Sequence, residues 1–378
     1  HAIGVLPVLA WAENDDRLNE DEALLNEVIA LVHGELGSAI LRSWEFPAEL
    51  VDVPQHYQRY DEQMPLSIAA YNAGHAKVTE WLARAPGEID VDLFVEHIPF
   101  DETVYSAGGE VNEEFASDVY RVAYTSMVTP HSVYDVDLTT GERVLKKRQP
   151  VLGGYDPALY DSTQILARAA DGTAVPVSLV WKRALRRDGE PQPLLMYGYG
   201  AYGIPVDPYF SSSRLSLLDR GVVFAIAHVR GGGDLGRRWY DEGKLAAKPN
   251  SFADLVACAQ ALIAQGWTTP QQLIIEGGSA GGLLVAAAAN LRPDLFRAVV
   301  AEVPFVDVIN TMLDETLPLT VGEFLEWGNP KTPADYAVMR GYSPYDNLRA
   351  AAYPAMYLRA GLNDSQVPYW EAAKFAAR

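Results

Sequence analysis

A serine that could act as a nucleophile stands at position 279, within the pattern Gly-x-Ser-x-Gly of residues 277–281. An apolar strand pattern precedes it, and an alanine-rich helical pattern over residues 283–290 follows it. This strand-turn-helix setting is typical of a nucleophile elbow, whose tight turn lifts the serine hydroxyl to the top of a sheet. Small residues are needed two positions either side of the serine, which accounts for Gly277 and Gly281. The indicated chemistry is acyl transfer through Ser279, and the alternative is a glycine-rich turn with a bystander serine.

A candidate acid follows a late strand. The apolar residues 355–358 lead into a loop, residues 361–365, that contains Asp364. An α/β-hydrolase keeps its triad carboxylate in such a loop, in the chain order Ser, acid, His. No histidine follows Asp364 in this sequence. The seven histidines are His1, His33, His56, His75, His97, His131 and His228. The sequence therefore predicts a hydrolase site whose general base is missing.

Apolar runs alternate with helical patterns from residue 177 onward. Buried strands are expected at 177–181, 194–197, 222–227, 273–275, 298–301 and 356–358. Helices are expected at 251–265, 282–290 and 369–378. This alternation predicts an α/β fold with a mostly parallel sheet and helices on both faces. Upstream, residues 1–63 and 64 to about 106 show helical spacing, and strand-like alternation begins at about residue 112.

Composition sets broad limits on function. The chain has 378 residues, of which 49% are hydrophobic, so a sizeable core is available. No run of about 18 apolar residues occurs, so no membrane span is expected. The net charge of −20 disfavours nucleic acid as a partner and favours cationic ligands, although solubility alone would also explain it. A single cysteine, Cys258, is expected to be a buried, inert thiol and fits a reducing, cytoplasmic compartment.

Many motifs along residues 112–378 resemble one family. They are the runs at 124–127, 153–156, 197–203, 228–233, 277–282, 303–308, 322–324, 326–330, 342–347 and 361–367. Together they resemble the oligopeptidase B group of the prolyl oligopeptidase family of serine peptidases. The resemblance implies an α/β-hydrolase domain at 151–378, truncated before its His-bearing loop, last strand and last helix. It also implies that residues 112–150 are the remnant of a β-propeller that caps the hydrolase domain.

The same resemblance assigns roles to site residues. Ser279 would be the nucleophile and Asp364 the acid that orients the base. The backbone N–H of Ala280 and the hydroxyl of Tyr199 would bind the oxyanion, and one such donor is worth roughly 3 kcal/mol of barrier. Tyr202 would belong to the substrate-binding residues. For Tyr199, a core aromatic with a satisfied hydroxyl is the alternative.

The resemblance further implies cleavage after Arg or Lys in short basic peptides. A cationic side chain that enters a pocket needs a carboxylate, because an unpaired buried guanidinium is costly. Glu323 matches the main glutamate that binds this side chain in the family, and Asp207 matches an acid of the neighbouring subsite. Leu325 and Tyr209 stand where the family often has a second acid at each place. Surface charge is the alternative for both acids.

Two weaker resemblances lie upstream. Residues 1–63 look like part of an HDOD domain, a non-catalytic helical signalling module, through His1–Pro7 and His33–Gly37. Residues 64–108 look like the end of a lytic transglycosylase domain, through Ala69–Gly74 and Phe94–Phe100. Three incomplete families in one chain indicate a fusion of fragments, and the alternative is one diverged protein.

No cofactor is expected. The His and carboxylate spacing gives no metal site, and Gly231–Gly233 lacks the Lys-Ser or Lys-Thr of a phosphate loop. His228 precedes Ser279 and belongs to a motif in which it is structural. The sequence thus predicts a serine oligopeptidase for basic peptides, of low activity without its histidine. A non-catalytic fusion or interaction protein with an HDOD-like segment is the alternative, and the oligomeric state is open.

Overall fold

The computed structural model describes residues 100–112, 117–187 and 189–378, which divide between two compact units. The first unit contains residues 100–101, 107–124 and 131–149, and the second contains residues 102–106, 125–130 and 150–378. The segment that resembles an HDOD domain lies outside the described residues, as does most of the segment that resembles a lytic transglycosylase.

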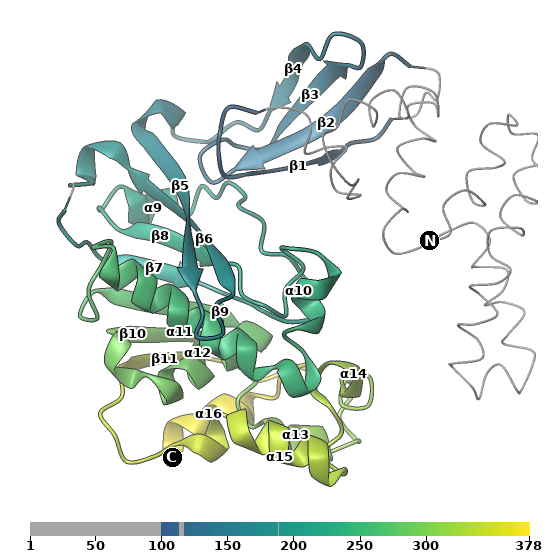
Figure 1. Cartoon of the computed structure of the whole chain (residues 1–378), viewed down its shortest axis with the longest axis vertical. Coiled ribbons are helices and arrows are strands. Elements are labelled where there is room, and N and C mark those ends of the chain that lie inside the picture. Colours follow the sequence, from purple (N-terminus) through teal and green to yellow (C-terminus); the bar gives the residue numbers. More distant parts are fainter. Residues whose placement is uncertain (1–99, 113–116, 188) are drawn as a thin grey trace, which may run out of the picture. The chain divides into compact units, whose positions relative to one another are not determined.

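The first unit is built around a four-stranded sheet in the order β1-β2-β3-β4 (Figure 1). Its strands are β1 (Tyr105–Gly109), β2 (Val119–Ser126), β3 (Ser132–Asp137) and β4 (Arg143–Arg148). The β2–β3 and β3–β4 pairs are antiparallel. Asp137 fixes the last turn, because its Oδ1 accepts the backbone N–H groups of Thr139 at 2.9 Å and Thr140 at 2.7 Å. One propeller blade is a four-stranded antiparallel sheet, and a propeller origin of the present sheet stays a prediction.

Strand β1 corrects one sequence-based interpretation. Helical spacing was expected from residue 64 to about 106, and the end of this segment, Tyr105 and Ser106, lies in strand β1. Gly108 and Gly109 are poor helix formers. A Cβ at Gly109 would also lie 2.4 Å from the Tyr120 hydroxyl, so this position packs closely against β2. Pairing with β2 and the two glycines together favour the extended backbone.

The second unit is an α/β domain around a seven-stranded sheet in the order β11-β10-β9-β7-β8-β6-β5. The strands are β5 (Tyr160–Arg168), β6 (Ala174–Lys182), β7 (Leu194–Tyr197), β8 (Val223–Ala227), β9 (Leu273–Gly278), β10 (Ala298–Glu302) and β11 (Ala355–Arg359). The five strands from β11 to β8 are parallel to one another. Strand β6 pairs with β8 in the antiparallel direction, and β5 pairs with β6 in the same way. The expected mostly parallel sheet is confirmed.

Alternate residues of the interior strand β8 face opposite sides of the sheet. Val223, Ala225 and Ala227 pack in the core cluster that includes residues of α11 (Pro249–Ala264) and α12 (Ala280–Leu291). Phe224 and Ile226 pack with Leu218 of α9 (Leu215–Leu218) in a separate cluster. Burial on both faces explains why β8 is apolar throughout, as expected for a parallel strand inside such a sheet.

The remaining α-helices lie in the segments between strands, except for α16, which follows β11. They are α10 (Arg237–Asp241), α13 (Val308–Leu313), α14 (Phe324–Trp327), α15 (Pro333–Tyr342) and α16 (Tyr369–Ala377). Figure 1 shows α13, α15 and α16 gathered beyond the β11 end of the sheet. Within the part of the chain that the structure describes, no helix is long and apolar enough to cross a membrane.

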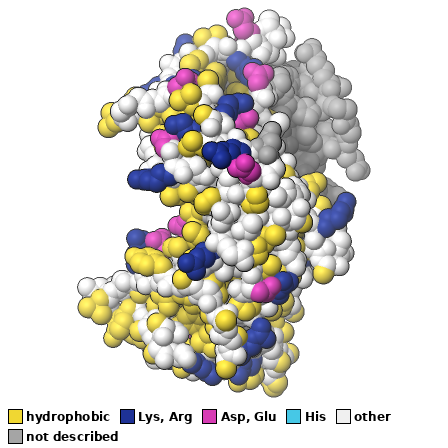
Figure 2. Space-filling model, turned by 90° about the vertical axis from the view of Figure 1, so that its left-hand side faces the viewer, with side chains coloured by type: hydrophobic (Ala, Val, Ile, Leu, Met, Phe, Trp, Pro, Cys, Tyr) yellow, Lys and Arg dark blue, Asp and Glu magenta, His cyan; other side chains and the backbone are white. Residues whose placement is uncertain are grey.

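Strand β11 forms an edge of the seven-stranded sheet. Tyr357 on this strand is 58% exposed, and Leu362 just after it is 73% exposed. Figure 2 shows hydrophobic side chains gathered in the lower half of one face, at the height that β10, β11 and α16 have in Figure 1. An edge strand with exposed apolar side chains is a site where another strand can pair.

Candidate active site

Ser279 lies in a tight turn between β9 and α12. Its backbone has φ 56° and ψ −116°, a conformation that costs free energy for a residue with a side chain. A Cβ at Gly277 would lie 2.2 Å from the carbonyl oxygen of Gly281, and one at Gly281 would lie 2.6 Å from that of Gly198. A Cβ at Gly282 would meet Pro304 at 2.6 Å. Gly277, Gly281 and Gly282 are therefore required by close contacts, as a nucleophile elbow demands.

The segment after β10 supports the elbow. The backbone N–H of Ser279 donates to the carbonyl of Glu302 at 2.9 Å, and the N–H of Phe305 donates to the carbonyl of Ser279 at 3.2 Å. Between them, Val303 has φ 41°, which is unusual for a β-branched residue. Its N–H donates to the carbonyl of Arg359 at the end of β11. Backbone bonds thus connect the serine to two neighbouring strands of the sheet.

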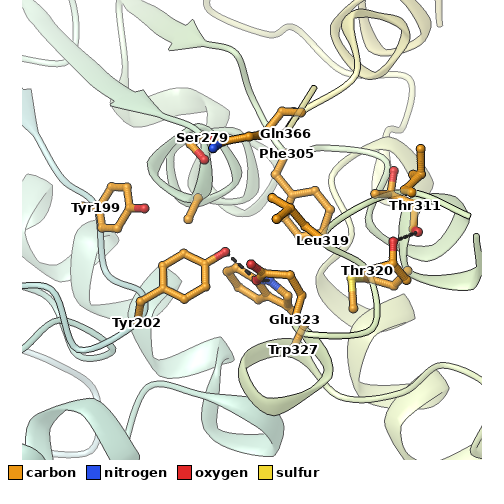
Figure 3. Close-up of a pocket in the computed structure, with 14 residues that line it drawn as sticks. Tyr199, Tyr202, Ser279, Phe305, Thr311, Leu319, Thr320, Glu323, Trp327 and Gln366 are labelled. Carbon is orange, nitrogen blue, oxygen red and sulfur yellow. Dashed lines mark hydrogen bonds between the residues drawn. The ribbon is translucent and has the colours of Figure 1, made fainter. Parts of the chain in front are cut away.

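Ser279 opens into a cavity of about 350 Å³. Its walls come from the loop after β7, the start of α12, the segment after β10 with α13 and α14, and the loop before α16. The lining residues are Tyr199, Tyr202, Ser279, Ala280, Phe305, Thr311, Met312, Leu317, Leu319, Thr320, Glu323, Trp327, Gln366 and Val367. Figure 3 shows the hydroxyl groups of Tyr199 and Ser279 directed toward the same space. Five of the seven site residues expected from the sequence therefore meet here.

Glu323 carries the carboxylate of this cavity. Its Oε2 accepts the Tyr202 hydroxyl at 2.7 Å and the indole N–H of Trp327 at 2.8 Å (Figure 3). The rings of Tyr202 and Trp327 meet edge to face, with centroids 5.6 Å apart. Tyr202 has φ 62°, so strained backbone accompanies this contact. The carboxylate is thus fixed in place between two neutral donors.

Tyr199 has a phenol that stays protonated at neutral pH. Burial raises its pKa, the charges of Glu323 and Glu326 raise it further, and a hydrogen bond with Ser279 opposes them. A protonated phenol can donate a hydrogen bond to an oxygen that becomes negative nearby. The backbone N–H of Ala280, at the first turn of α12, is a second candidate donor.

Helix α13 forms one wall and is held by α16. Glu371, fully buried on α16, accepts the backbone N–H groups of Val306 at 2.7 Å and Asp307 at 2.9 Å. It also accepts the hydroxyl of Thr311 at 2.7 Å, and Lys374 pairs with Asp307. Burial raises the pKa of Glu371 to about 7, and the three hydrogen bonds oppose this rise. The sequence analysis did not single out Glu371, because a lone glutamate in a helix carries no pattern of its own.

Asp364 does not line the cavity. Its Oδ1 accepts the backbone N–H groups of Gln366 at 2.9 Å and Val367 at 3.0 Å, so it shapes the loop that does. Figure 3 shows Gln366 beside Ser279. Asp364 and Asp207, the two acids that the sequence analysis named besides Glu323, are thus both absent from the cavity lining.

Asp207 lies near a second polar cluster. Burial and the charge of Asp234 raise its pKa. Asp234 itself accepts the backbone N–H of Val206 at 3.0 Å and contacts Nδ1 of His228 at 2.7 Å. The other ring nitrogen of His228 lies 2.7 Å from the hydroxyl of Ser178. Both ring nitrogens of His228 are therefore engaged away from Ser279, which agrees with the structural role expected for it.

The described residues contain two histidines, His131 and His228, and neither lines the cavity. No group of three or more His, Cys, Asp or Glu side chains that could hold a metal occurs among the described residues. Cys258 is buried, and burial raises the pKa of its thiol well above the ordinary range. The cavity offers a serine hydroxyl, hydrogen-bond donors for an oxyanion and one carboxylate in an aromatic setting.

The sheet topology and the serine at a strained turn between β9 and α12 define an α/β-hydrolase fold with a nucleophile elbow. Comparison with known proteins shows which family within this class the chain resembles. Residues 208–378 match the prolyl oligopeptidase family. This part of the chain is similar to members of that family.

Two curated relatives illustrate the match. Dipeptidyl aminopeptidase BI of Pseudoxanthomonas mexicana is 48% identical over 291 residues, which are 77% of this chain and 40% of that protein. Protease 2 of Moraxella lacunata is 43% identical over 284 residues, which are 75% of this chain and 41% of that protein. The chain thus spans about 40% of the length of these relatives.

Solved structures agree. Oligopeptidase B from Trypanosoma brucei, in a closed form with covalently bound antipain, has a TM-score of 0.69 and 48% identity. The match covers 74% of this chain and 40% of that one. Oligopeptidase B from Leishmania major has a TM-score of 0.69 and 44% identity, over 74% of this chain and 39% of that one.

Proposed function

We propose that the α/β-hydrolase part of this chain hydrolyses peptide bonds after Arg or Lys in short peptides, through an acyl-enzyme on Ser279. The observation that carries the proposal is the presence of Ser279 and the Glu323 carboxylate in one cavity. The nucleophile and the group that would recognise a cationic side chain thus face the same space. Similarity to oligopeptidase B structures supports the proposal.

The acylation step would use three groups of the cavity. The Ser279 oxygen attacks the scissile carbonyl carbon, and its proton passes to a general base. The carbonyl oxygen becomes an oxyanion and accepts hydrogen bonds from the Ala280 N–H and the Tyr199 hydroxyl. Collapse of the tetrahedral intermediate expels the amine, which takes up the proton from the base. Water then hydrolyses the acyl-enzyme by the same route.

The preference for a basic side chain would come from Glu323. Tyr202 and Trp327 both donate to Oε2, so Oε1 is the oxygen that a guanidinium or ammonium would approach. A charge-assisted hydrogen bond in a partly desolvated pocket is stronger than a neutral one. The aromatic rings of Tyr202, Phe305 and Trp327 would pack against the aliphatic part and the plane of an arginine side chain.

The described residues of the cavity do not include a general base for this mechanism. Serine is a weak nucleophile at neutral pH without a neighbouring base, and neither described histidine reaches the cavity. We infer that an imidazole must be supplied next to Ser279, with Asp364 as the acid that would orient it. Without it, oxyanion binding and substrate binding alone leave about 10³–10⁴-fold acceleration over the uncatalysed reaction.

The test compares the chain with a version extended by the sequence that follows the matched region in the Moraxella lacunata relative. Hydrolysis of an arginyl coumarylamide is expected to be slow for the chain itself. The extended version is expected to be at least 10³-fold faster, and Ser279→Ala in it should remove the gain. Turnover near one per second by the unextended chain would contradict the inference about the base.

A second candidate function is binding without cleavage. The specific observation in its favour is again that no described imidazole lies at the cavity. The chain would then bind basic peptides through Glu323 and release them intact. Equal affinity for arginine and citrulline peptides would contradict both functions, whereas arginine-selective binding by an extended chain that does not cleave would favour this one.

A further inference from the structure

A second glutamate lies beneath the pocket with a different environment. Glu323 is the residue before α14, and Glu326 lies within this helix three positions later. The side chain of Glu326 is almost completely buried. Its Oε2 accepts the hydroxyl of Tyr240 at 2.8 Å, and its Oε1 lies 3.4 Å from the ammonium of Lys248. Glu323 faces the cavity, whereas Glu326 faces a buried cation.

The buried cation beside Glu326 is the ammonium group of Lys248. It is 2% exposed, and its ammonium donates to the carbonyl of Gly200 at 2.6 Å. The same ammonium lies 4.7 Å from the centre of the Trp327 ring. Burial lowers the pKa of Lys248 to about 8 and the charge of Glu326 opposes this, so the side chain remains mostly charged at pH 7.

The cation of Lys248 is separated from the pocket carboxylate by one indole ring. The Trp327 side chain receives the ammonium over its face and donates its N–H to Glu323 at 2.8 Å. A unit charge this close to a buried pocket acts strongly on a second charge that enters it, because the effective dielectric constant is well below that of water. An uncompensated Lys248 would therefore repel the cation of a basic ligand.

We propose that Glu326 is a further specificity-determining residue, which preserves the preference for a cationic side chain by neutralising Lys248 beneath the pocket. The inference rests on the proposed function, since it concerns the same pocket. With the pair intact, the charge of Glu326 offsets that of Lys248, and the negative charge of Glu323 remains in the cavity. Without Glu326, the charge of Lys248 would offset that of Glu323, and the attraction for arginine would fall while the shape of the pocket stayed the same.

The two members of the pair therefore have opposite expected effects. Glu326→Gln removes the charge that raises the pKa of Lys248, so the titrations are made at pH 6, where the ammonium keeps its proton more readily than at pH 7. Under these conditions the variant is expected to lower selectivity for a cation. Lys248→Met removes the ammonium with a side chain of similar length, so selectivity should be kept or increased. The double variant restores the charge balance, since replacing both partners of a buried pair is often close to neutral in stability.

The experiment uses the full chain and two peptide probes of the same shape, one with a charged and one with an uncharged side chain. The affinities of acetyl-Phe-Arg-amide and acetyl-Phe-citrulline-amide are measured by titration at low salt, and the ratio of their dissociation constants gives the selectivity. Thermal melting of every variant reports on folding. Glu190→Gln, the same change at a glutamate that is 62% exposed and does not line the cavity, is the matched control.

The expected result is a loss of at least tenfold in selectivity for Glu326→Gln, arising from the arginine peptide, with less than a threefold change for the citrulline peptide. Lys248→Met and the double variant should keep at least the selectivity of the unaltered chain. Equal weakening of both peptides by Glu326→Gln, or unchanged selectivity, would overturn the inference. If Glu326→Gln does not fold, a tenfold loss of selectivity in Lys248→Met would overturn it instead, and retained selectivity there and in the double variant would support it.

Failure of the proposed function is a distinct result. It would appear as equal affinity of the unaltered chain for the arginine and citrulline peptides, which overturns both proposals. A clear arginine preference in the unaltered chain together with an unchanged preference in Glu326→Gln overturns the present inference alone.

Discussion

The hydroxyl of Tyr202 and the carboxylate of Glu323 are 121 positions apart in the sequence and are joined by a hydrogen bond of 2.7 Å. Tyr202 follows β7 and Glu323 precedes α14, so the bond connects two walls of the cavity. The phenol of Tyr202 holds one carboxylate oxygen of Glu323 in place. The position of this carboxylate in the cavity therefore depends on how the two segments pack.

Replacement of Glu323 tests the pocket. In the extended chain, Glu323→Gln is expected to lower kcat/KM for an arginyl substrate by on the order of 10²-fold or more, because a desolvated guanidinium loses its partner. Hydrolysis of a matched phenylalanyl substrate should change little. Undiminished preference for arginine would show that another acid binds the side chain, and Asp207 would be the next to test.

The glycines of the elbow give a test of stability with an internal control. Gly277→Ala should lower the free energy of unfolding by about 3 kcal/mol or prevent folding, because its Cβ would lie 2.2 Å from a backbone oxygen that cannot move freely. Gly278→Ala should cost far less, since the nearest atom there lies at 3.7 Å. Similar losses in urea unfolding for the two variants would contradict the steric account.

Glu371 predicts a dependence of stability on pH. Its pKa in the folded chain is about 7, above the ordinary value of 4.5, so the folded state holds this proton more tightly than the unfolded state does. The resulting stabilisation is fully present below pH 4.5 and is lost as the pH rises through 7.

Glu371→Gln should remove this component. The difference in melting temperature between pH 5 and pH 8 is expected to shrink in the variant. The corresponding change in the free energy of unfolding is about 1–3 kcal/mol, as expected for a pKa shift of this size. Glu190→Gln, whose side chain is 62% exposed, serves as control and should leave the pH dependence unchanged. An identical pH dependence in Glu371→Gln and the unaltered chain would refute the prediction.

The exposed edge of the sheet predicts an effect on solubility. Tyr357→Lys places a charge on β11 where the side chain is 58% exposed, so aggregation on heating should decrease while the melting temperature stays within about 2 °C. Light scattering and circular dichroism measure the two quantities. Unchanged aggregation would show that this edge does not initiate it.

Much of the α/β domain could be predicted because its signals are local. The strand at 194–197 was expected with the bounds that β7 has, and the helix at 251–265 differs from α11 by two residues at its start and by one at its end. The pattern Gly-x-Ser-x-Gly identified the elbow, since the turn itself imposes the glycines. Strand β5 was missed, because its buried and exposed residues do not form a continuous apolar run.

The buried polar contacts could not be predicted in the same way. Lys248, Glu326 and Tyr240 come together from three separate segments, and each alone resembles a surface residue in sequence. The spacing of Glu323 and Trp327, four positions apart on one helical turn, was a usable signal that the sequence analysis did not take up. Contacts between side chains of distant segments depend on the fold, so these contacts could be identified only from the structure.

The most direct test of the central claim is a carbon-13 NMR spectrum of the chain with a peptidyl argininal labelled at the aldehyde carbon. An aldehyde adds reversibly to a serine hydroxyl, and the product is a hemiacetal with a distinct resonance. The account predicts a hemiacetal signal for the unaltered chain that is absent in Ser279→Ala and weakened at least tenfold in Glu323→Gln or with the citrulline aldehyde. A signal that persists in Ser279→Ala, or equal binding of the two aldehydes, would contradict the account.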